Sequence, residues 1–153
     1  MDAIKLLSKD HDTVKKLLEE LVATTARASK KRAQLAEQIK RELEIHTMLE
    51  DEIFYPAFRS AAESKDDERL YFEALEEHHA VGDLVVPDLV ATPVGSEKFS
   101  GRAKVLKELV EHHIKEEEGE MFKRARKLMD KHQLETLGEQ LHGRKEELLH
   151  AIT

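Results

Sequence analysis

The sequence has no cysteine and no tryptophan, and only 6 glycines and 3 prolines among 153 residues. Without cysteine, the chain has no disulfide bond, no thiolate nucleophile and no cysteine-ligated zinc site, and it suits a reducing compartment. Few helix-breaking residues, together with abundant Glu, Lys, Leu and Ala, predict an all-helical protein. Residues 1–153 are expected to form a single domain that is large enough to bury a sizeable core.

Long apolar runs and a basic charge balance are also missing. No apolar stretch approaches the roughly 20 residues that a membrane span needs, and Met1 to Lys5 lack the basic and apolar regions of a secretion signal. The formal net charge of -7 disfavours nucleic-acid binding, because phosphates require a basic face. We therefore expect a cytoplasmic protein that binds neither membranes nor nucleic acids.

Apolar residues recur at steps of three and four along most of the chain, which is the pattern of amphipathic helices. The expected long helices span residues 2–25, Ser29 to about Ala57, Asp66 or Asp67 to Pro87, and Ser96 or Ser100 to residue 129. Short connections predict an antiparallel up-down-up-down four-helix bundle over about residues 2–129. A shorter fifth helix, over about residues 131–151, is expected to pack outside it.

Local signals predict where these helices begin, bend and end. Asp2 and Ser8 are candidate N-caps of the first helix. Pro56 is expected to kink the second helix or weaken its last turns, and Pro87 is expected to kink or end the third. Residues 60–66 form the expected turn between them. Asp130 and Gln133 have the spacing of a capping box, which would start the fifth helix.

The chain is rich in histidine, with nine. Each of the four long helices carries one on its apolar face, and two of these histidines are followed four residues later by a glutamate, a spacing that stacks both side chains on one helix face. The residues concerned are His11, His46, Glu50, His78, His113 and Glu117.

One histidine of this kind is most often a hydrogen-bonded core residue, and one His-x-x-x-Glu pair is usually a surface pair. Four helices that each direct a polar residue into one core need another explanation, because burying carboxylates without partners costs several kcal/mol. A pair of cations bridged by Glu50 and Glu117 supplies the compensation. Imidazole and carboxylate ligands without thiolate suit iron or manganese, and zinc less distinctively. By contrast, His132, His142 and His150 are expected at the surface of the fifth helix.

Several motifs occur in a characteristic order. They are Lys9-Asp10-His11, His46-x-x-x-Glu50 followed by Glu52-Ile53-Phe54-Tyr55-Pro56, Glu76-Glu77-His78-His79, and His113-Ile114-Lys115-Glu116-Glu117-Glu118. In this combination the sequence resembles the hemerythrin-like proteins with an HHE cation-binding domain. The resemblance implies a four-helix bundle that holds a non-haem di-iron centre, with two carboxylates bridging the irons and histidines completing their coordination.

The third helix departs from the pattern of muscle-type hemerythrins. These proteins have His-x-x-x-His there, whereas Gly82 follows His78 and Asp83 follows His79 at that spacing. The acidic residues before His78 and the apolar face both favour His78 over His79. One iron would then have fewer histidines and carry an open position, a water, or another carboxylate such as Glu52 or Asp83.

Two glutamates compete for the second bridging position on the fourth helix. Glu117 lies four residues after His113 and on the apolar face, while Glu118 lies at the five-residue step of muscle-type hemerythrins. The apolar face favours Glu117 and the resemblance keeps Glu118 as the alternative.

The preferred functional hypothesis is reversible binding of dioxygen, or another small diatomic ligand, for storage, delivery or sensing. Its basis is a histidine-rich site with few general acids, buried among aliphatic side chains. The alternative is an enzyme that acts on peroxide or nitric oxide at the same centre, using the position left by the missing histidine. A ferritin-like iron oxidase, suggested only by Glu76-x-x-His79, and a metal-free structural bundle rank lower.

Overall fold

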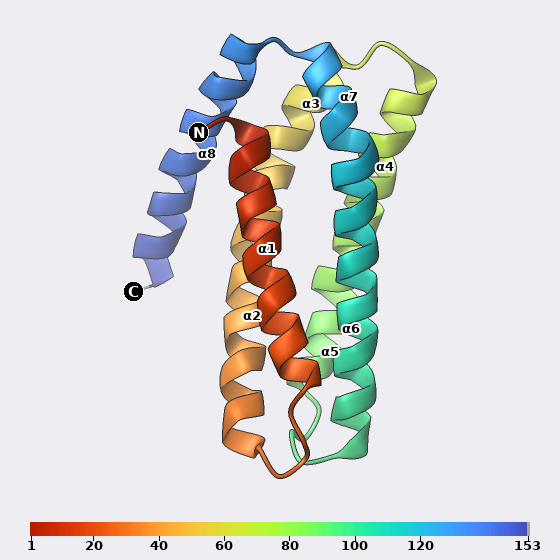
Figure 1. Ribbon diagram of the computed structural model, residues 1–153, viewed down its shortest axis with the longest axis vertical. Coiled ribbons are helices and arrows are strands. Elements are labelled where there is room, and N and C mark those ends of the chain that lie inside the picture. The colour runs from red at the N-terminus through yellow and green to blue at the C-terminus, as the bar shows by residue number, and fades with distance from the viewer. Residues whose placement is uncertain (153) are drawn as a thin grey trace.

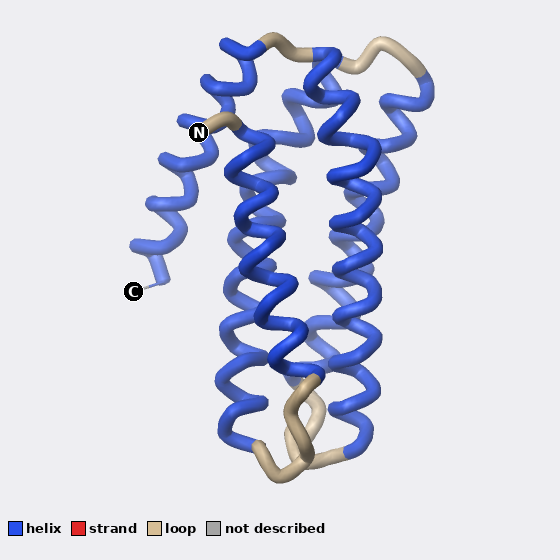
Figure 2. Tube along the Cα trace, in the orientation of Figure 1, coloured by secondary structure: helices blue, strands red, loops and turns tan. Residues whose placement is uncertain are grey.

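The computed structural model describes residues 1–152 and consists of helices joined by short loops (Figure 2). The described residues contain no strand, which confirms the all-helical prediction. Consecutive elements join into long rods, which Figure 1 shows side by side with their connections alternating between the two ends. The rods are α1 (Ala3–Val22); α2 (Ser29–Leu49), η1 (Glu50–Phe54) and α3 (Tyr55–Ala61); α4 (Lys65–His79), η2 (Ala80–Val85) and α5 (Val86–Val90); and α6 (Glu97–Glu116), η3 (Glu117–Met121) and α7 (Phe122–Leu128).

The helix ends follow local side-chain chemistry. The Asp2 carboxylate accepts a hydrogen bond from the Lys5 backbone N–H at 2.8 Å, so Asp2 caps α1, whereas Ser8 lies inside the helix. Ser64 and Asp67 form a reciprocal capping box that starts α4. The turn before α4 is therefore shorter than expected from the sequence, since α3 continues to Ala61.

Neither Pro56 nor Pro87 ends its helix. Each follows a π-helical turn, η1 or η2, in which backbone bonds reach back five residues, as from Tyr55 N–H to the Glu50 carbonyl. The wider turn tolerates the missing proline N–H, because the usual four-residue bond is not formed there. A third such turn, η3, occurs without proline.

The π-helical turn η1 also shifts which residues face the core. The regular periodicity predicts Ile53 and Ala57 on the buried face, but Phe54 and Phe58 are the fully buried residues, while Ile53 and Ala57 are only partly buried. A π-helical turn inserts one extra residue, so the buried face moves on by one position. This part of the predicted core was therefore wrong by one residue.

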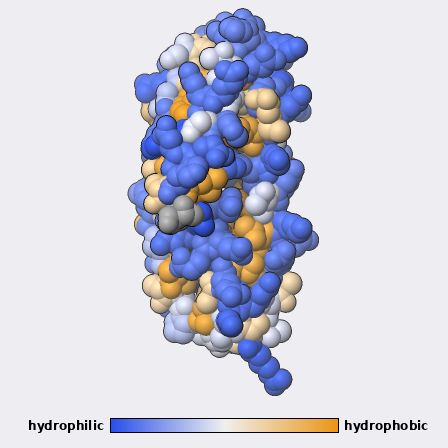
Figure 3. All heavy atoms as spheres, turned by 90° about the vertical axis from the view of Figure 1, so that its left-hand side faces the viewer, coloured by the Kyte–Doolittle hydropathy of each residue, from blue (hydrophilic) through white to orange (hydrophobic). Residues whose placement is uncertain are grey.

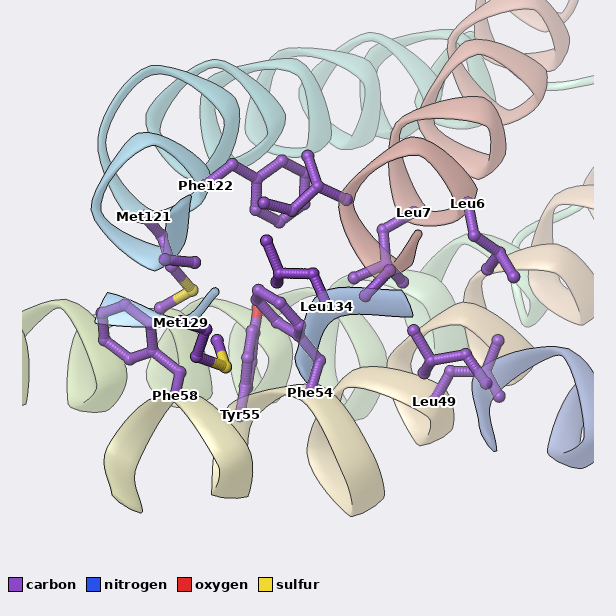
Figure 4. Packing of buried hydrophobic residues seen from close by; sticks show 14 of the residues in the cluster. Leu6, Leu7, Leu49, Phe54, Tyr55, Phe58, Met121, Phe122, Met129 and Leu134 are labelled. Carbon is purple, nitrogen blue, oxygen red and sulfur yellow. The ribbon is translucent and has the colours of Figure 1, made fainter. Parts of the chain in front are cut away.

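Two hydrophobic clusters fill the interior and leave a gap for polar residues between them. The aromatic cluster includes Phe54, Tyr55, Phe58, Met121 and Phe122, and Figure 4 shows these side chains packed against one another from two rods. The aliphatic cluster includes Val14, Leu18, Leu35, Leu106 and Val110. Each fully buried Leu or Phe side chain contributes about 1.5–3 kcal/mol to the stability of the fold, so the two clusters stabilise the helices on both sides of the gap.

The last helix, α8 (Lys131–Ile152), lies against α1 and runs down the outside of the rods (Figure 1). The predicted capping box at its start is confirmed, because Asp130 and Gln133 exchange two hydrogen bonds of 2.8 Å. The side of the molecule that carries α8 is mostly hydrophilic with small hydrophobic patches (Figure 3). Within the described residues, no helix combines the length and apolar character needed to cross a bilayer.

Candidate metal centre

The gap between the two clusters holds all six residues that the sequence predicted as metal ligands. On α1, His11 lies between Leu7 of the aromatic cluster and Val14 of the aliphatic one. The ligand atoms form two groups, each spanning no more than 4.8 Å, and both groups share Glu50 and Glu117. One group adds His11 and His46, and the other adds His78 and His113. The structure thus brings the six residues together in a pattern suited to two ions with two bridging carboxylates.

The distances are similar on the two sides of this centre. His46 Nε2 lies 2.9 Å and His78 Nε2 3.1 Å from Glu50 Oε1. His11 Nε2 lies 3.1 Å from Glu117 Oε1, and His113 Nε2 lies 3.2 Å from Glu117 Oε2. All four histidines therefore turn Nε2 towards the two carboxylates.

Each histidine binds a different carboxylate through its other ring nitrogen, Nδ1. We call these four acids the outer carboxylates: Glu118 with His11 at 2.7 Å, Asp10 with His46 at 3.2 Å, Asp51 with His78 at 2.8 Å, and Glu77 with His113 at 2.9 Å. A carboxylate that accepts from Nδ1–H fixes the ring orientation and leaves the Nε2 lone pair for a metal ion. This arrangement is the usual support of metal-ligating histidines.

Several buried polar atoms of the centre lack a hydrogen bond, although other polar atoms lie near them. They are both Glu50 carboxylate oxygens, Glu117 Oε1 and His113 Nε2. In addition, His11 Nε2 and His46 Nε2 face each other at 3.1 Å, so a cation between them would bind both lone pairs after the Nε2 protons are lost. Buried polar atoms without partners are costly, and bound cations would satisfy them, so the residues present fit a metal pair.

The carboxylates also control the protonation of the imidazoles. Burial opposes the charged form of His46, but the charge of Glu50 and the hydrogen bonds to Asp10 and Glu50 outweigh it and raise the pKa to about 10. Burial likewise opposes the charged form of His78, whose hydrogen bonds to Asp51 and Glu50 raise the pKa to about 8. Metal ions would replace these protons, so binding is coupled to proton release.

Tyr55 is a member of the centre that sequence reasoning missed. Its buried hydroxyl donates a short hydrogen bond to Glu117 and lies 3.1 Å from His78 Nε2. Burial and the charge of Glu117 raise its pKa well above the usual range, so the hydroxyl keeps its proton. The sequence motif Glu52-Ile53-Phe54-Tyr55-Pro56 contains this residue, but regular periodicity does not place its side chain in the core, because the π-helical turn η1 precedes it.

The other candidate residues lie away from the centre. Glu52 pairs with Arg144 of α8 and Asp83 pairs with the exposed His79, so neither carboxylate reaches the centre. The additional oxygen beside His78 is the Tyr55 hydroxyl. Glu118 is an outer carboxylate, and Glu117 occupies the central position. The exposed positions of Glu76 and His79 also contradict a ferritin-like site there. His132, His142 and His150 are exposed, as expected.

A small cavity of about 30 Å³ lies beside the centre. The four central histidines line one side of it, and aliphatic side chains, including Leu43, Val81 and Val110, line much of the rest. A cavity volume of roughly 10–15 Å³, measured in the same way, is enough for one water molecule, so this space suits a ligand of only a few atoms.

Comparison with known proteins agrees with this geometry. The model of the hemerythrin HHE cation-binding domain matches residues 2–125. The chain belongs to the hemerythrin HHE family. This confirms the resemblance noted from the motifs, and membership implies a metal-binding helical protein with a histidine and glutamate cluster.

A solved structure also supports the assignment of this chain to the HHE family. It is a hemerythrin HHE cation-binding domain-containing protein from Mycobacterium kansasii, with 27% sequence identity and a TM-score of 0.85. The similarity covers 99% of this chain and 89% of that chain, so it includes α8. No functionally curated protein matches the sequence significantly.

Proposed function

We propose that this chain is a non-haem di-iron protein that binds dioxygen reversibly. In this proposal a single domain comprises an antiparallel four-helix bundle over about residues 2–129 and the C-terminal helix. His11, His46, His78 and His113 are terminal ligands, and Glu50 and Glu117 bridge the two ions. The observation that carries the metal assignment is the shared pair of buried carboxylates in two overlapping ligand groups.

Iron is the preferred metal because of the donor set. Four imidazoles and two carboxylates without thiolate suit iron, with manganese or zinc as alternatives. A bound iron pair would supply redox chemistry and a coordination position for a small ligand. The chain itself provides rigid imidazoles, held from outside by the outer carboxylates, and two acids that balance the charge of the ions.

The small cavity favours dioxygen as the ligand. Its volume of about 30 Å³ and its aliphatic lining favour an uncharged molecule of two or three atoms. Because Val14, Leu43 and Val110 present no hydrogen-bonding groups there, they disfavour water and charged solutes. These apolar surroundings therefore disfavour release of the bound ligand as a charged species.

A surface groove offers the route to this cavity. The groove has a volume of about 430 Å³, is lined by residues of α2, α4 and η2, and shares Leu43, Thr47, His78 and Val81 with the cavity. These shared residues separate the groove from the centre. We therefore assign small-ligand entry to the gap between α2 and η2.

A second candidate function follows from Tyr55. Its protonated hydroxyl contacts the central carboxylate Glu117, so the chain has a general acid where the sequence suggested few. This observation supports turnover of peroxide or nitric oxide as the second candidate. The two functions differ in whether the ligand is released unchanged.

Anaerobic loading with ferrous iron followed by oxygen tests both functions. The preferred function predicts two irons per chain and a visible absorption band that appears with oxygen and disappears when oxygen is removed. Irreversible oxidation would eliminate the carrier. Steady-state consumption of peroxide or nitric oxide well above that of free iron would instead establish the enzyme.

A further inference from the structure

Helix α8 lies outside the segment that the family model matches, yet it reaches the surroundings of the metal centre. The model matches residues 2–125, whereas α8 spans Lys131–Ile152. Figure 1 shows α8 alongside α1, the helix that carries His11 and Asp10. Side chains of α8 can therefore contact residues that surround the centre.

A chain of polar contacts runs from α8 to a central histidine. Lys145 Nζ lies 2.6 Å from Asp10 Oδ1, and the other oxygen of the same carboxylate, Oδ2, accepts from His46 Nδ1 at 3.2 Å. His46 Nε2 in turn lies 2.9 Å from Glu50 Oε1. Lys145 is thus two contacts away from His46 and three contacts away from the proposed bridging carboxylate Glu50.

Asp10 differs from the other three outer carboxylates. Its side chain is only 7% exposed, compared with 39% for Asp51, 28% for Glu77 and 35% for Glu118. Among the outer carboxylates within residues 1–152, only Asp10 forms an ion pair with a lysine or arginine. A carboxylate as buried as Asp10 needs such a partner, because water cannot compensate its charge.

Close packing holds α8 at the distance that this contact requires. A Cβ atom at Gly138 would lie 2.2 Å from the Met1 carbonyl oxygen and 2.9 Å from the Asp2 carbonyl carbon, so only glycine permits the observed approach to α1. Further along α8, Arg144 binds the Glu52 carboxylate at 2.9 and 3.3 Å. Arg144 therefore anchors the same helix without contacting an outer carboxylate.

We propose that Lys145 is a positioning residue for the metal ion held by His11 and His46, acting through Asp10. Lys145 fixes one Asp10 oxygen and balances its charge, while the other oxygen holds His46 Nδ1–H so that Nε2 faces the ion. Docking of α8 thereby controls one half of the centre, whereas His78 and His113 are oriented within the rods alone. This inference rests on the proposed di-iron site.

The first measurement uses the metal-free protein and is independent of iron. NMR should detect the His46 Hδ1 proton protected from water exchange in the unchanged protein and in Arg144→Met, which removes an α8 anchor of the same charge. In Lys145→Met the proton should exchange at least about tenfold faster, and Lys145→Arg should restore part of the protection. Equal protection in Lys145→Met would overturn the proposal.

The second measurement is anaerobic titration with ferrous iron, using only variants whose helical content matches the unchanged protein. Lys145→Met should weaken one of the two ions about tenfold and leave the other unchanged, while Arg144→Met retains both affinities. Lys145→Gln provides the same test if the methionine variant does not fold. Equal losses of iron affinity in the Lys145 and Arg144 variants would mean that Lys145 only anchors α8, and would overturn the proposal. Failure of the unchanged protein to bind paired iron would refute the di-iron function, whereas the exchange measurement would still test the Lys145–Asp10–His46 contacts.

Discussion

Replacing Tyr55 with phenylalanine isolates the hydroxyl that the structure adds to the centre. The Tyr55 ring packs in the aromatic cluster (Figure 4). It also stacks on the His78 ring with 5.1 Å between centroids, and phenylalanine keeps both contacts. The substitution removes the hydrogen bond to Glu117 and the contact of the hydroxyl with His78 Nε2. The lost hydrogen bond joins a neutral donor to a buried carboxylate.

The expected magnitude follows from the charge of the acceptor. Hydrogen bonds to charged groups contribute about 1.5–3 kcal/mol, so Tyr55→Phe should lower the free energy of unfolding of the metal-free protein by this amount. That is a factor of about 10–150 in the unfolding constant, and a large share of the roughly 5–15 kcal/mol of a typical domain. Urea unfolding with an unchanged slope measures the loss.

Tyr71→Phe is the matched control for this substitution. The Tyr71 ring touches Tyr55, but within the described residues its hydroxyl forms no hydrogen bond, so its loss should change the free energy of unfolding by less than about 0.5 kcal/mol. Equal effects of the two variants would refute the reasoning. In the iron-loaded protein, Tyr55→Phe should reduce peroxide turnover at constant iron content if the centre is an enzyme, and should preserve reversible oxygen binding if it is a carrier.

Three further predictions concern pH, packing and access. The pKa values of His46 and His78 are raised to about 10 and about 8, so their stabilising effect on the metal-free protein is complete below about pH 6.5 and declines as pH rises through 8 and 10. Thermal unfolding should thus occur at lower temperature at pH 10 than at pH 6.5, and a rise would contradict the assigned contacts. Gly138→Ala should lower the free energy of unfolding measured in urea, because the new Cβ would overlap the backbone that begins α1. Gly143→Ala is the control, since its Cβ meets no atom and the exchange should raise the free energy of unfolding by up to about 1 kcal/mol. The reverse order of stability would refute the packing of α8. Val81→Trp should slow oxygen association in stopped-flow experiments by narrowing the proposed route, at unchanged iron content, and an unchanged rate would move the entry elsewhere.

The central residues were predictable because their spacing follows the regular helix. His11 lies in the apolar pattern of α1, and His46 with Glu50 precedes the first departure from that pattern. The choice of Glu117 over Glu118 also followed from periodicity, and in the structure Glu117 lies in both ligand groups while Glu118 does not. Regular three- and four-residue steps are therefore enough to predict the central histidines and glutamates.

The surroundings of the centre depend on features that this periodicity does not contain. The π-helical turn η1, which begins at Glu50, shifts the buried face. The shift brings Tyr55 inwards and places Phe54 instead of Ile53 in the core. Asp51 lies within a Glu- and Asp-rich stretch, so the sequence does not distinguish it from its acidic neighbours. Its contact with His78 arises from the packing of α4 against the rod that contains η1. The Lys145 contact joins residues 135 positions apart and requires the docked α8.

The central claim is that Glu50 and Glu117 bridge two iron ions. It is tested most directly by the iron content of anaerobically loaded protein and of the double variant Glu50→Ala with Glu117→Ala, with Glu118→Ala as the matched control. The account predicts two irons per chain in the unchanged protein, two in Glu118→Ala at reduced affinity, and loss of paired binding in the double variant. Two irons retained by the double variant would contradict it.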